Sequence, residues 1–216
     1  MSSPVLDTLA GHRLVPVVVV DGADQGLALA DALTAGGLPV AEITLRTAGG
    51  LDAIRAVARD RPDVVVGAGT VTTAAQVDAV ADAGARYVVS PGLSRAVVER
   101  ARHHELPVLP GVATPTEIMA ALDLGVETVK LFPANVVGGP AALKAFAAPF
   151  PALRFVPTGG VSATNLPDYL ALKPVLAVGG SWMVAKPLVD AGDWAEITRL
   201  TGEAVALAAP STKENR

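Results

Sequence analysis

Short apolar runs rich in valine recur along the whole chain, and each is separated from the next by a stretch with helical character. Near-continuous apolar runs are typical of parallel strands in a sheet that helices cover on both faces. The intervals between the runs leave room for one strand, one helix and two short loops. The pattern therefore predicts eight strands, at residues 14–20, 39–45, 64–68, 87–90, 107–110, 128–132, 153–157 and 175–178.

Helix signals stand between these runs, where the pattern requires them. Gly84 and Gly125 follow segments rich in alanine or leucine, at positions where a glycine commonly ends a helix. A last helix is expected from residue 193 to about residue 208. Residues that cap a helix N-terminus come in pairs: Thr73 with Gln76, Thr114 with Glu117, and Asp193 with Glu196.

Eight alternating units over about 200 residues predict an α/β fold, a single (β/α)8 TIM barrel, with an open doubly wound sheet as the alternative. Nearly every candidate polar group lies at the C-terminal end of a different predicted strand. In a barrel those ends converge on one mouth, so this placement favours the barrel. We expect one domain over residues 1–216, with a short N-terminal segment at 1–12, the C-terminal helix and a flexible tail at 209–216.

A single lysine stands inside the apolar strand expected at 128–132. Because side chains alternate along a strand, Thr128, Lys130 and Phe132 share one face. Burial disfavours the charged form of an amine, and a neutral amine can attack a carbonyl carbon to form a Schiff base. The alternative is a structural lysine, held in a buried ion pair or reaching the end of its strand.

Three polar residues alternate with apolar ones around the second predicted strand: Glu42, Thr44 and Arg46. A carboxylate and a guanidinium that faced the helical layer would be costly to bury, so these side chains are expected to face the barrel interior. There Glu42 is a candidate general acid and base. The alternative is an ion pair between Glu42 and Arg46 on an edge strand.

The motif VGAGTV brings Gly67, Gly69 and Thr70 to the end of the third predicted strand. Its glycines resemble a dinucleotide-binding fingerprint, but the third glycine of that pattern is missing. Bare backbone beside a threonine hydroxyl can instead approach a substrate carboxylate. Tight turning from strand to helix would also account for both glycines.

Two glycine pairs end the seventh and eighth predicted strands. In barrels of this kind, the loops after these strands usually bind phosphate through backbone N–H groups and the positive end of a helix dipole. One pair alone would indicate a turn, whereas two pairs at these strands favour a phosphorylated ligand. The candidate residues are Thr158, Gly159, Gly160, Gly179, Gly180 and Ser181.

Composition narrows the classes of partner and site. Acidic residues outnumber basic ones, 21 to 17, and no basic run is interleaved with aromatics, so no nucleic-acid partner is expected. The first residues lack a basic leader and the run at 14–20 is too short for a membrane span. Cysteine is absent, which excludes disulfides and thiolate chemistry and fits the cytoplasm. His103 and His104 are adjacent and His12 is isolated, so no histidine-based metal site is expected.

Eight motifs stand in order along residues 14–193: PVVVV, EITLRT, VGAGTV, VSPGL, LPGVATPTEI, VKLFPA, RFVPTGG and VGGSWMV. Together they resemble the 2-keto-3-deoxy-6-phosphogluconate (KDPG) aldolase family, whose bacterial members often also act on 4-hydroxy-2-oxoglutarate. This resemblance implies a class I aldolase on a (β/α)8 barrel, which needs neither cofactor nor metal and is usually a homotrimer.

The resemblance implies a role for individual residues. Lys130 matches the lysine that forms the Schiff base, and Glu42 matches the general acid and base. Asn135 is a departure, because many relatives carry an acidic residue at this position. The other matches are Arg46 and Thr70 for the pyruvate carboxylate, Phe132 and Thr158 for the pocket wall, and Gly159, Gly160, Gly180 and Ser181 for the phosphate.

We therefore expect cleavage of KDPG to pyruvate and D-glyceraldehyde 3-phosphate, with 4-hydroxy-2-oxoglutarate as a second substrate. One alternative is an aldolase for the galactonate-derived epimer of KDPG. Another is a phosphosugar isomerase or epimerase, with Glu42 as the base and Lys130 as an electrostatic stabiliser. A third is a sensor that binds a phosphorylated ligand without catalysis.

Overall fold

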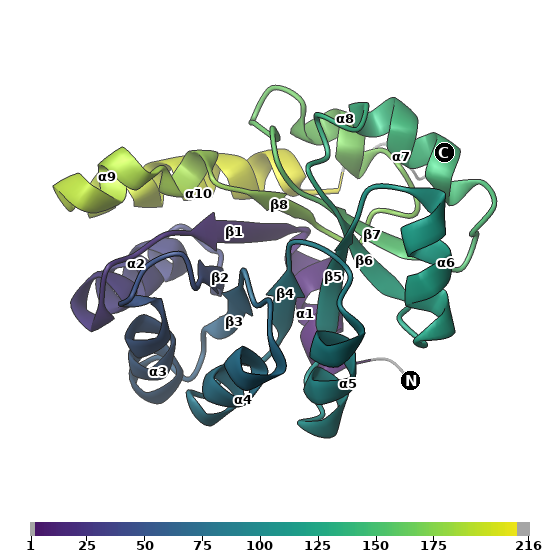
Figure 1. The fold of residues 1–216 in the computed structure, drawn as a ribbon. Coiled ribbons are helices and arrows are strands. Elements are labelled where there is room, and N and C mark those ends of the chain that lie inside the picture. Colours follow the sequence, from purple (N-terminus) through teal and green to yellow (C-terminus); the bar gives the residue numbers. More distant parts are fainter. Residues whose placement is uncertain (1–2, 211–216) are drawn as a thin grey trace.

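The computed structural model describes residues 3–210, which form eight parallel strands alternating with helices (Figure 1). The strands lie in the order β7-β6-β5-β4-β3-β2-β1-β8. Two isolated bridges, Phe155 with Val175 and Thr158 with Gly179, join the β7 edge of the sheet to the chain entering and forming β8. Because the two edges meet, the predicted (β/α)8 barrel is confirmed and the open doubly wound sheet is wrong.

All the strands run in one direction, so their C-terminal ends gather at one mouth of the barrel. The strands are β1 (Leu14–Val18), β2 (Val40–Thr44), β3 (Val65–Gly69), β4 (Val88–Ser90), β5 (Val108–Val112), β6 (Thr128–Leu131), β7 (Arg154–Pro157) and β8 (Val178–Gly180). The helices are α1 (Pro4–His12), α2 (Ala23–Ala35), α3 (Gly50–Asp60), α4 (Ala74–Asp82), α5 (Arg95–His103), α6 (Pro115–Asp123), α7 (Gly139–Ala147), α8 (Leu166–Leu170), α9 (Lys186–Ala191) and α10 (Trp194–Ala208), with a 3-10 turn, η1 (Trp182–Val184). None of the helices within residues 3–210 is long and apolar enough to cross a membrane.

The predicted bounds of the eighth strand are wrong, whereas those of the other seven agree with the structure to within two residues. Val175 makes only a single bridge, to Phe155, and regular pairing with β1 begins at Val178. The strand then continues through the glycine pair. A side chain at Gly179 would not fit there, because its Cβ would lie 2.2 Å from Oγ1 of Thr158.

The predicted helix caps are present. The Thr73 hydroxyl accepts a hydrogen bond from the N–H of Gln76, whose side chain accepts one from the N–H of Thr73, so the capping box is complete. At α6 the Thr114 hydroxyl accepts from the N–H of Glu117. The Glu117 carboxylate there accepts from the N–H of Ala113 rather than from that of the cap residue.

The predicted helix ends are also confirmed. Gly84 and Gly125 have φ values of +89° and +69°, a left-handed conformation that glycine adopts without steric cost. The Asp193 carboxylate accepts a hydrogen bond from the N–H of Glu196, and the helix that it begins ends at Ala208.

The N-terminal segment contains a helix, α1, that the hydrophobic pattern did not predict. Val5 and Leu9 of this helix are buried. Arg13, which follows it, donates hydrogen bonds to the carbonyl oxygens of Ala208 at 2.9 Å and Leu170 at 2.8 Å. These bonds fasten the N-terminal segment to α10 and α8. Residues 1–2, and residues 211–216 of the expected tail, lie outside the described part of the chain.

An ion-pair cluster joins α4 to the end of α5. The Asp78 carboxylate accepts hydrogen bonds from Arg100 Nε at 2.5 Å and from His104 Nε2 at 2.6 Å. The Arg100 hydrogen bond, followed by the one from His104, lowers the pKa of Asp78 below its ordinary value of 3.8. Because the carboxyl has a lower pKa in the folded chain, it stabilises the fold above pH 3.8 and loses this effect as the pH falls further.

We predict that Asp78→Asn lowers the melting temperature at neutral pH and that the difference from the unsubstituted protein narrows between about pH 5 and pH 3. Thermal unfolding followed by circular dichroism across this range measures the difference. Asp82→Asn is the control, because Asp82 lies on the same helix and forms no ion pair within the described residues. A gap of constant size across the range would contradict the prediction.

Candidate active site

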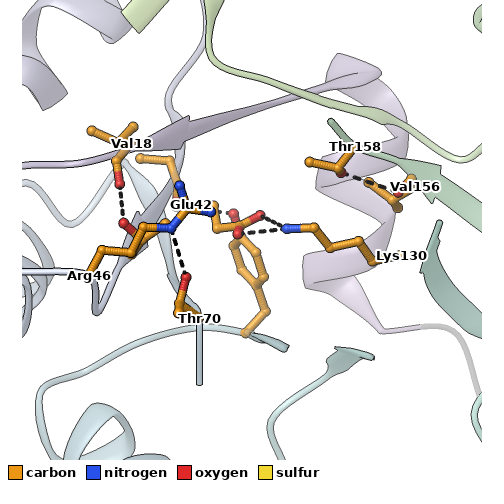
Figure 2. A network of polar contacts seen from close by, with 10 residues as sticks. Val18, Glu42, Arg46, Thr70, Lys130, Val156 and Thr158 are labelled. Carbon is orange, nitrogen blue, oxygen red and sulfur yellow. Dashed lines mark hydrogen bonds and ion pairs between the residues drawn. The ribbon is translucent and has the colours of Figure 1, made fainter. Parts of the chain in front are cut away.

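Lys130 and Glu42 meet inside the barrel, as Figure 2 shows. Lys130 lies in β6 and Glu42 in β2, and three strands separate β6 from β2 in either direction around the barrel. The two side chains therefore reach toward each other from opposite walls. Lys130 Nζ donates to Glu42 Oε1 at 3.0 Å and lies 3.4 Å from Oε2.

This ion pair is almost completely shielded from water, with Lys130 5% and Glu42 3% exposed. Either charge alone would be costly to bury, and the partner offsets part of that cost. Nζ also lies 5.4 Å from the centre of the Phe132 ring, within the range of a cation–π contact. A proton that crosses the 3.0 Å contact would leave a neutral amine facing a carboxylic acid.

This buried ion pair fits the structural interpretation of Lys130. It fits the catalytic interpretation as well, because the carboxylate can accept the proton that an amine must lose before it acts as a nucleophile. The alternative in which Glu42 pairs with Arg46 is wrong. Arg46 instead donates from Nε to the Thr70 hydroxyl at 3.3 Å, on the outer side of the pair (Figure 2).

Bare backbone in β3 makes room for the Glu42 side chain. A Cβ added at Gly69 would lie 2.4 Å from Glu42 Oε1, and one added at Gly67 would lie 2.3 Å from the ring of Tyr87. Both glycines lie within β3 rather than in a turn, so their interpretation as turning residues is wrong. They permit two large side chains to approach the strand closely.

Tyr87 is fully buried, and its environment includes the Glu42 carboxylate. Its hydroxyl donates to the carbonyl oxygen of Ala41 at 3.1 Å. Burial, and then the negative charge of Glu42, raise the pKa of Tyr87 well above its ordinary value of 10.0. The hydroxyl therefore keeps its proton at physiological pH and remains a hydrogen-bond donor to the backbone of β2.

Arg46 and Thr70 lie side by side where β2 and β3 end. Thr70 has a φ of +61°, a left-handed conformation that is rare for a β-branched residue, and its hydroxyl accepts the Arg46 Nε hydrogen bond. The terminal nitrogens of Arg46 have no hydrogen-bond partner within residues 3–210, so the planar guanidinium can bind a carboxylate. Thr44 is excluded from such a role, because its buried hydroxyl donates to the carbonyl oxygen of Val18 at 2.8 Å.

A cavity of ≈ 530 Å³ opens at the mouth of the barrel. Thr70, Lys130 and Glu42 are not among the residues that line it. The lysine ammonium nevertheless lies 5.4 Å from the ring centre of Phe132, which is a lining residue. The structure therefore brings the predicted catalytic pair to the inner side of the predicted binding residues. Those that line the cavity are Arg46, Phe132, Thr158, Gly159, Gly160, Gly179, Gly180 and Ser181.

The segment after β6 braces the glycine loop after β7. The N–H of Ala134 donates to the carbonyl oxygen of Thr158 at 2.8 Å, and the N–H of Asn135 donates to that of Gly159 at 3.0 Å. Gly160 has a φ of +74°, and a Cβ there would lie 2.4 Å from Cβ of Asn135. The unusual asparagine therefore lies directly against the candidate phosphate loop.

Sequence reasoning missed part of the cavity wall. Trp182 carried a signal, because it belongs to the motif VGGSWMV, and its ring lies so close to Gly180 that a Cβ there would be 1.9 Å away. Lys186 carried none, since it stands outside every motif. The other missed residues are Val17, Val19, Val161, Val184 and Ala185.

Comparison with known families agrees with this geometry. The family model for KDPG and KHG aldolases matches residues 5–200. The chain belongs to this family.

Within residues 3–210, no group of three or more His, Asp or Glu side chains is placed to hold a metal ion.

Two curated members of the family and one solved structure are similar over nearly the whole chain. The 2-dehydro-3-deoxy-phosphogluconate aldolase of Pseudomonas aeruginosa is 52% identical over 93% of this chain and 91% of its own length. The KHG/KDPG aldolase of Escherichia coli is 47% identical over 89% of this chain and 90% of its own. The KDPG aldolase of Legionella pneumophila, crystallised with pyruvate captured as a covalent carbinolamine intermediate, superposes with a TM-score of 0.90 at 39% identity, over 94% of this chain and 98% of its own.

We predict that Gly69→Ala displaces the Glu42 carboxylate, because the added methyl group would lie 2.4 Å from Oε1. Overpacking of this kind typically costs about 1–3 kcal/mol, so the melting temperature should fall. A crystal structure of the variant should show the Lys130–Glu42 contact longer than 3.0 Å.

Gly11→Ala is the matched control, because a Cβ at Gly11 would meet nothing within 4 Å. This control should keep the ion pair, and its melting temperature should stay the same or rise, because alanine favours the helix α1 in which Gly11 lies. An unchanged contact in Gly69→Ala would mean that Gly69 does not limit the position of Glu42.

Proposed function

We propose that the chain is a class I aldolase that cleaves KDPG to pyruvate and D-glyceraldehyde 3-phosphate, and 4-hydroxy-2-oxoglutarate to pyruvate and glyoxylate. The observation that carries the proposal is the buried contact of 3.0 Å between Lys130 Nζ and Glu42. It lies at the inner side of a cavity with two glycine loops suited to phosphate. The names of both curated relatives, and the pyruvate carbinolamine of the Legionella enzyme, support the same chemistry.

The first stage forms the iminium. Glu42 takes a proton from Lys130, whose neutral Nζ then attacks the C2 ketone of the substrate. As the C=O π bond opens, Glu42 donates its proton to the oxygen and takes one from the nitrogen, which gives the neutral carbinolamine. Glu42 returns the proton to the C2 hydroxyl, which leaves as water while the nitrogen lone pair forms the C=N bond. The resulting positive nitrogen is an electron sink next to the bond that must break.

The second stage breaks the bond between C3 and C4. Glu42 removes the proton of the C4 hydroxyl, C4 becomes the aldehyde carbon, and the electron pair of the broken bond forms an enamine on Lys130. Glu42 then protonates the enamine carbon, and water releases pyruvate from the lysine. Every proton transfer uses the carboxylate that already contacts Nζ.

The binding residues hold the substrate at both ends. Arg46 and Thr70 bind the carboxylate next to C2, since the guanidinium fork matches its two oxygens. Phe132 and Thr158 line the wall between the two ends. The phosphate lies against backbone N–H groups of the loop after β7 and of the C-terminal end of β8, at Gly159, Gly160, Gly179, Gly180 and Ser181. Fixing both ends aligns the scissile bond with the lysine.

The alternatives explain less of the site. An isomerase or a phospholigand sensor has no use for an amine that can pass its proton to a carboxylate in a site shielded from water. The gluconate-derived substrate is favoured over its galactonate epimer because the curated relatives are named for the former.

We further propose that the chain is one domain and works as a homotrimer in the cytoplasm. The support for one domain is that α1 at the start of the chain is bonded to α10 at its end. The support for association is exposed apolar surface on α6, where Met119 is 58% and Leu122 38% exposed, and in the segment between β6 and α7, where Val136 is 80% exposed. Sedimentation velocity tests the oligomeric state.

We predict that borohydride with pyruvate fixes mass on Lys130 and on none of Lys144, Lys173 and Lys186, as read by peptide mass spectrometry. Lys130→Met and Lys130→Arg should abolish the adduct and lower kcat by at least about a thousandfold. The arginine variant keeps a charge opposite Glu42, so a loss in both variants is not a consequence of an unpaired carboxylate. An adduct that persists in either variant would refute the assignment of Lys130.

We predict that Glu42→Gln still forms the pyruvate imine, but slowly, because an amide can accept the Nζ hydrogen bond without exchanging a proton. Deuterium uptake into the pyruvate methyl group, followed by NMR, should fall by roughly 10²–10⁴-fold. Glu127→Gln is the control, since Glu127 is exposed and lies before β6, at the opposite end of the barrel. Undiminished uptake in Glu42→Gln would mean that another group is the base.

A further inference from the structure

Lys186 is a second cation at the cavity that the proposed mechanism does not use. It is the first residue of α9 and lines the cavity together with Gly160, Gly180 and Ser181, the candidate phosphate residues. The only other lysine or arginine among the lining residues within the described chain is Arg46, whose guanidinium is assigned to the substrate carboxylate. The phosphate end therefore has one cationic side chain within its wall.

Two carboxylates hold this lysine in place. Lys186 Nζ donates to Asp190 Oδ1 at 2.6 Å and lies 3.5 Å from Asp21 Oδ2. Asp190 is one turn further along α9, and Asp21 lies in the loop after β1, the strand that pairs with β8, so the side chain bridges two neighbouring segments at the mouth. The hydrogen bond to Asp190, with the charges of both aspartates, raises the pKa of Lys186 above its ordinary value of 10.5 and keeps the ammonium charged.

The ammonium has donor capacity to spare. It carries three hydrogens, of which the short bond to Asp190 uses one. The contact to Asp21 is at the outer limit of a hydrogen bond, and the pair is about half exposed, so breaking it costs little. A phosphate dianion entering the cavity offers a stronger acceptor than a long contact to a single carboxylate oxygen.

A full positive charge would strengthen phosphate binding beyond what the glycine pairs supply. Backbone N–H groups carry only partial positive charge, and the Ser181 hydroxyl is neutral. A compact ammonium on a flexible stem can meet a phosphate oxygen without requiring one orientation.

Resting on the proposed function, we propose that Lys186 is a further substrate-binding residue, which selects phosphorylated over unphosphorylated keto acids. Its ammonium keeps the bond to Asp190 and exchanges the contact to Asp21 for an oxygen of the substrate phosphate. The start of α9 would thus add a charged side chain to the backbone N–H groups that the glycine pairs offer the phosphate.

Lys186→Met tests the proposal, because methionine keeps most of the stem and removes the charge. The KM for KDPG should rise roughly five- to tenfold while kcat changes by less than about twofold. Cleavage of 4-hydroxy-2-oxoglutarate, which has no phosphate, should change by less than about twofold in either constant. In Lys186→Arg, which keeps the positive charge, the KM for KDPG should stay close to that of the unsubstituted enzyme.

Lys173→Met is the matched control. Lys173 is exposed and lies before β8, at the end of the barrel away from the mouth, so this variant has the same net charge without altering the cavity. Its constants should equal those of the unsubstituted enzyme. Equal KM values for KDPG in Lys186→Met and Lys173→Met would overturn the proposal, as would an equal loss on both substrates in Lys186→Met.

Trapping with pyruvate and borohydride separates this proposal from the function on which it rests, because pyruvate carries no phosphate. Lys186→Met should be trapped as efficiently as the unsubstituted enzyme. If the unsubstituted enzyme is not trapped, the proposed function fails. If trapping is normal and the KM for KDPG is unchanged in Lys186→Met, only the role of Lys186 fails.

Discussion

The buried contact between Lys130 and Glu42 is the interaction on which the arrangement of the barrel mouth depends. The two residues are 88 positions apart in the chain and lie on opposite walls, so only a closed barrel of this width brings them within hydrogen-bond distance. Removing one partner of a buried pair typically costs 3–5 kcal/mol, as an order of magnitude, because the other charge is left without compensation. Closure of the sheet and burial of the pair therefore support each other, and the same pair supplies an amine and its proton acceptor.

Space for the pair comes from residues without side chains. The interior of an eight-stranded barrel is just wide enough to be filled by side chains, so a large group on one strand requires a small one opposite. Gly69 leaves room for Glu42 and Gly67 for the ring of Tyr87, while Gly179 does the same for Thr158. The glycines around the site are therefore fixed by packing as much as by any contact with a ligand.

The sequence pattern predicts those features of the structure that are set by residues close together in the chain. Alternation along a strand is sufficient to turn Lys130 and Glu42 toward the interior, and the caps at Thr73 and Thr114 are local as well. Contacts between distant strands are not available to such reasoning, which is why the sequence alone leaves open whether Gly67 and Gly69 are turning residues. The same limit explains Lys186, whose contact to Asp21 spans 165 positions and leaves no periodic signal. The helix α1 escapes prediction because it precedes β1 and so stands outside the alternation of strands and helices that locates the other helices.

The depth of each residue in the barrel separates chemistry from selectivity. Glu42, deep in the barrel, has contacts in several directions. It bonds to Lys130, lies against the backbone at Gly69, and its charge contributes to the raised pKa of Tyr87. At the rim each cationic side chain instead makes one long contact, 3.3 Å from Arg46 to Thr70 and 3.5 Å from Lys186 to Asp21, although Lys186 also keeps a short bond of 2.6 Å to Asp190. Long, solvent-exposed contacts exchange for a ligand at little cost, whereas a short buried one does not. If the proposed roles hold, substitutions at the rim change which acid the cavity accepts without disturbing the reaction proposed at Lys130. One interior arrangement could then serve both phosphorylated and unphosphorylated substrates.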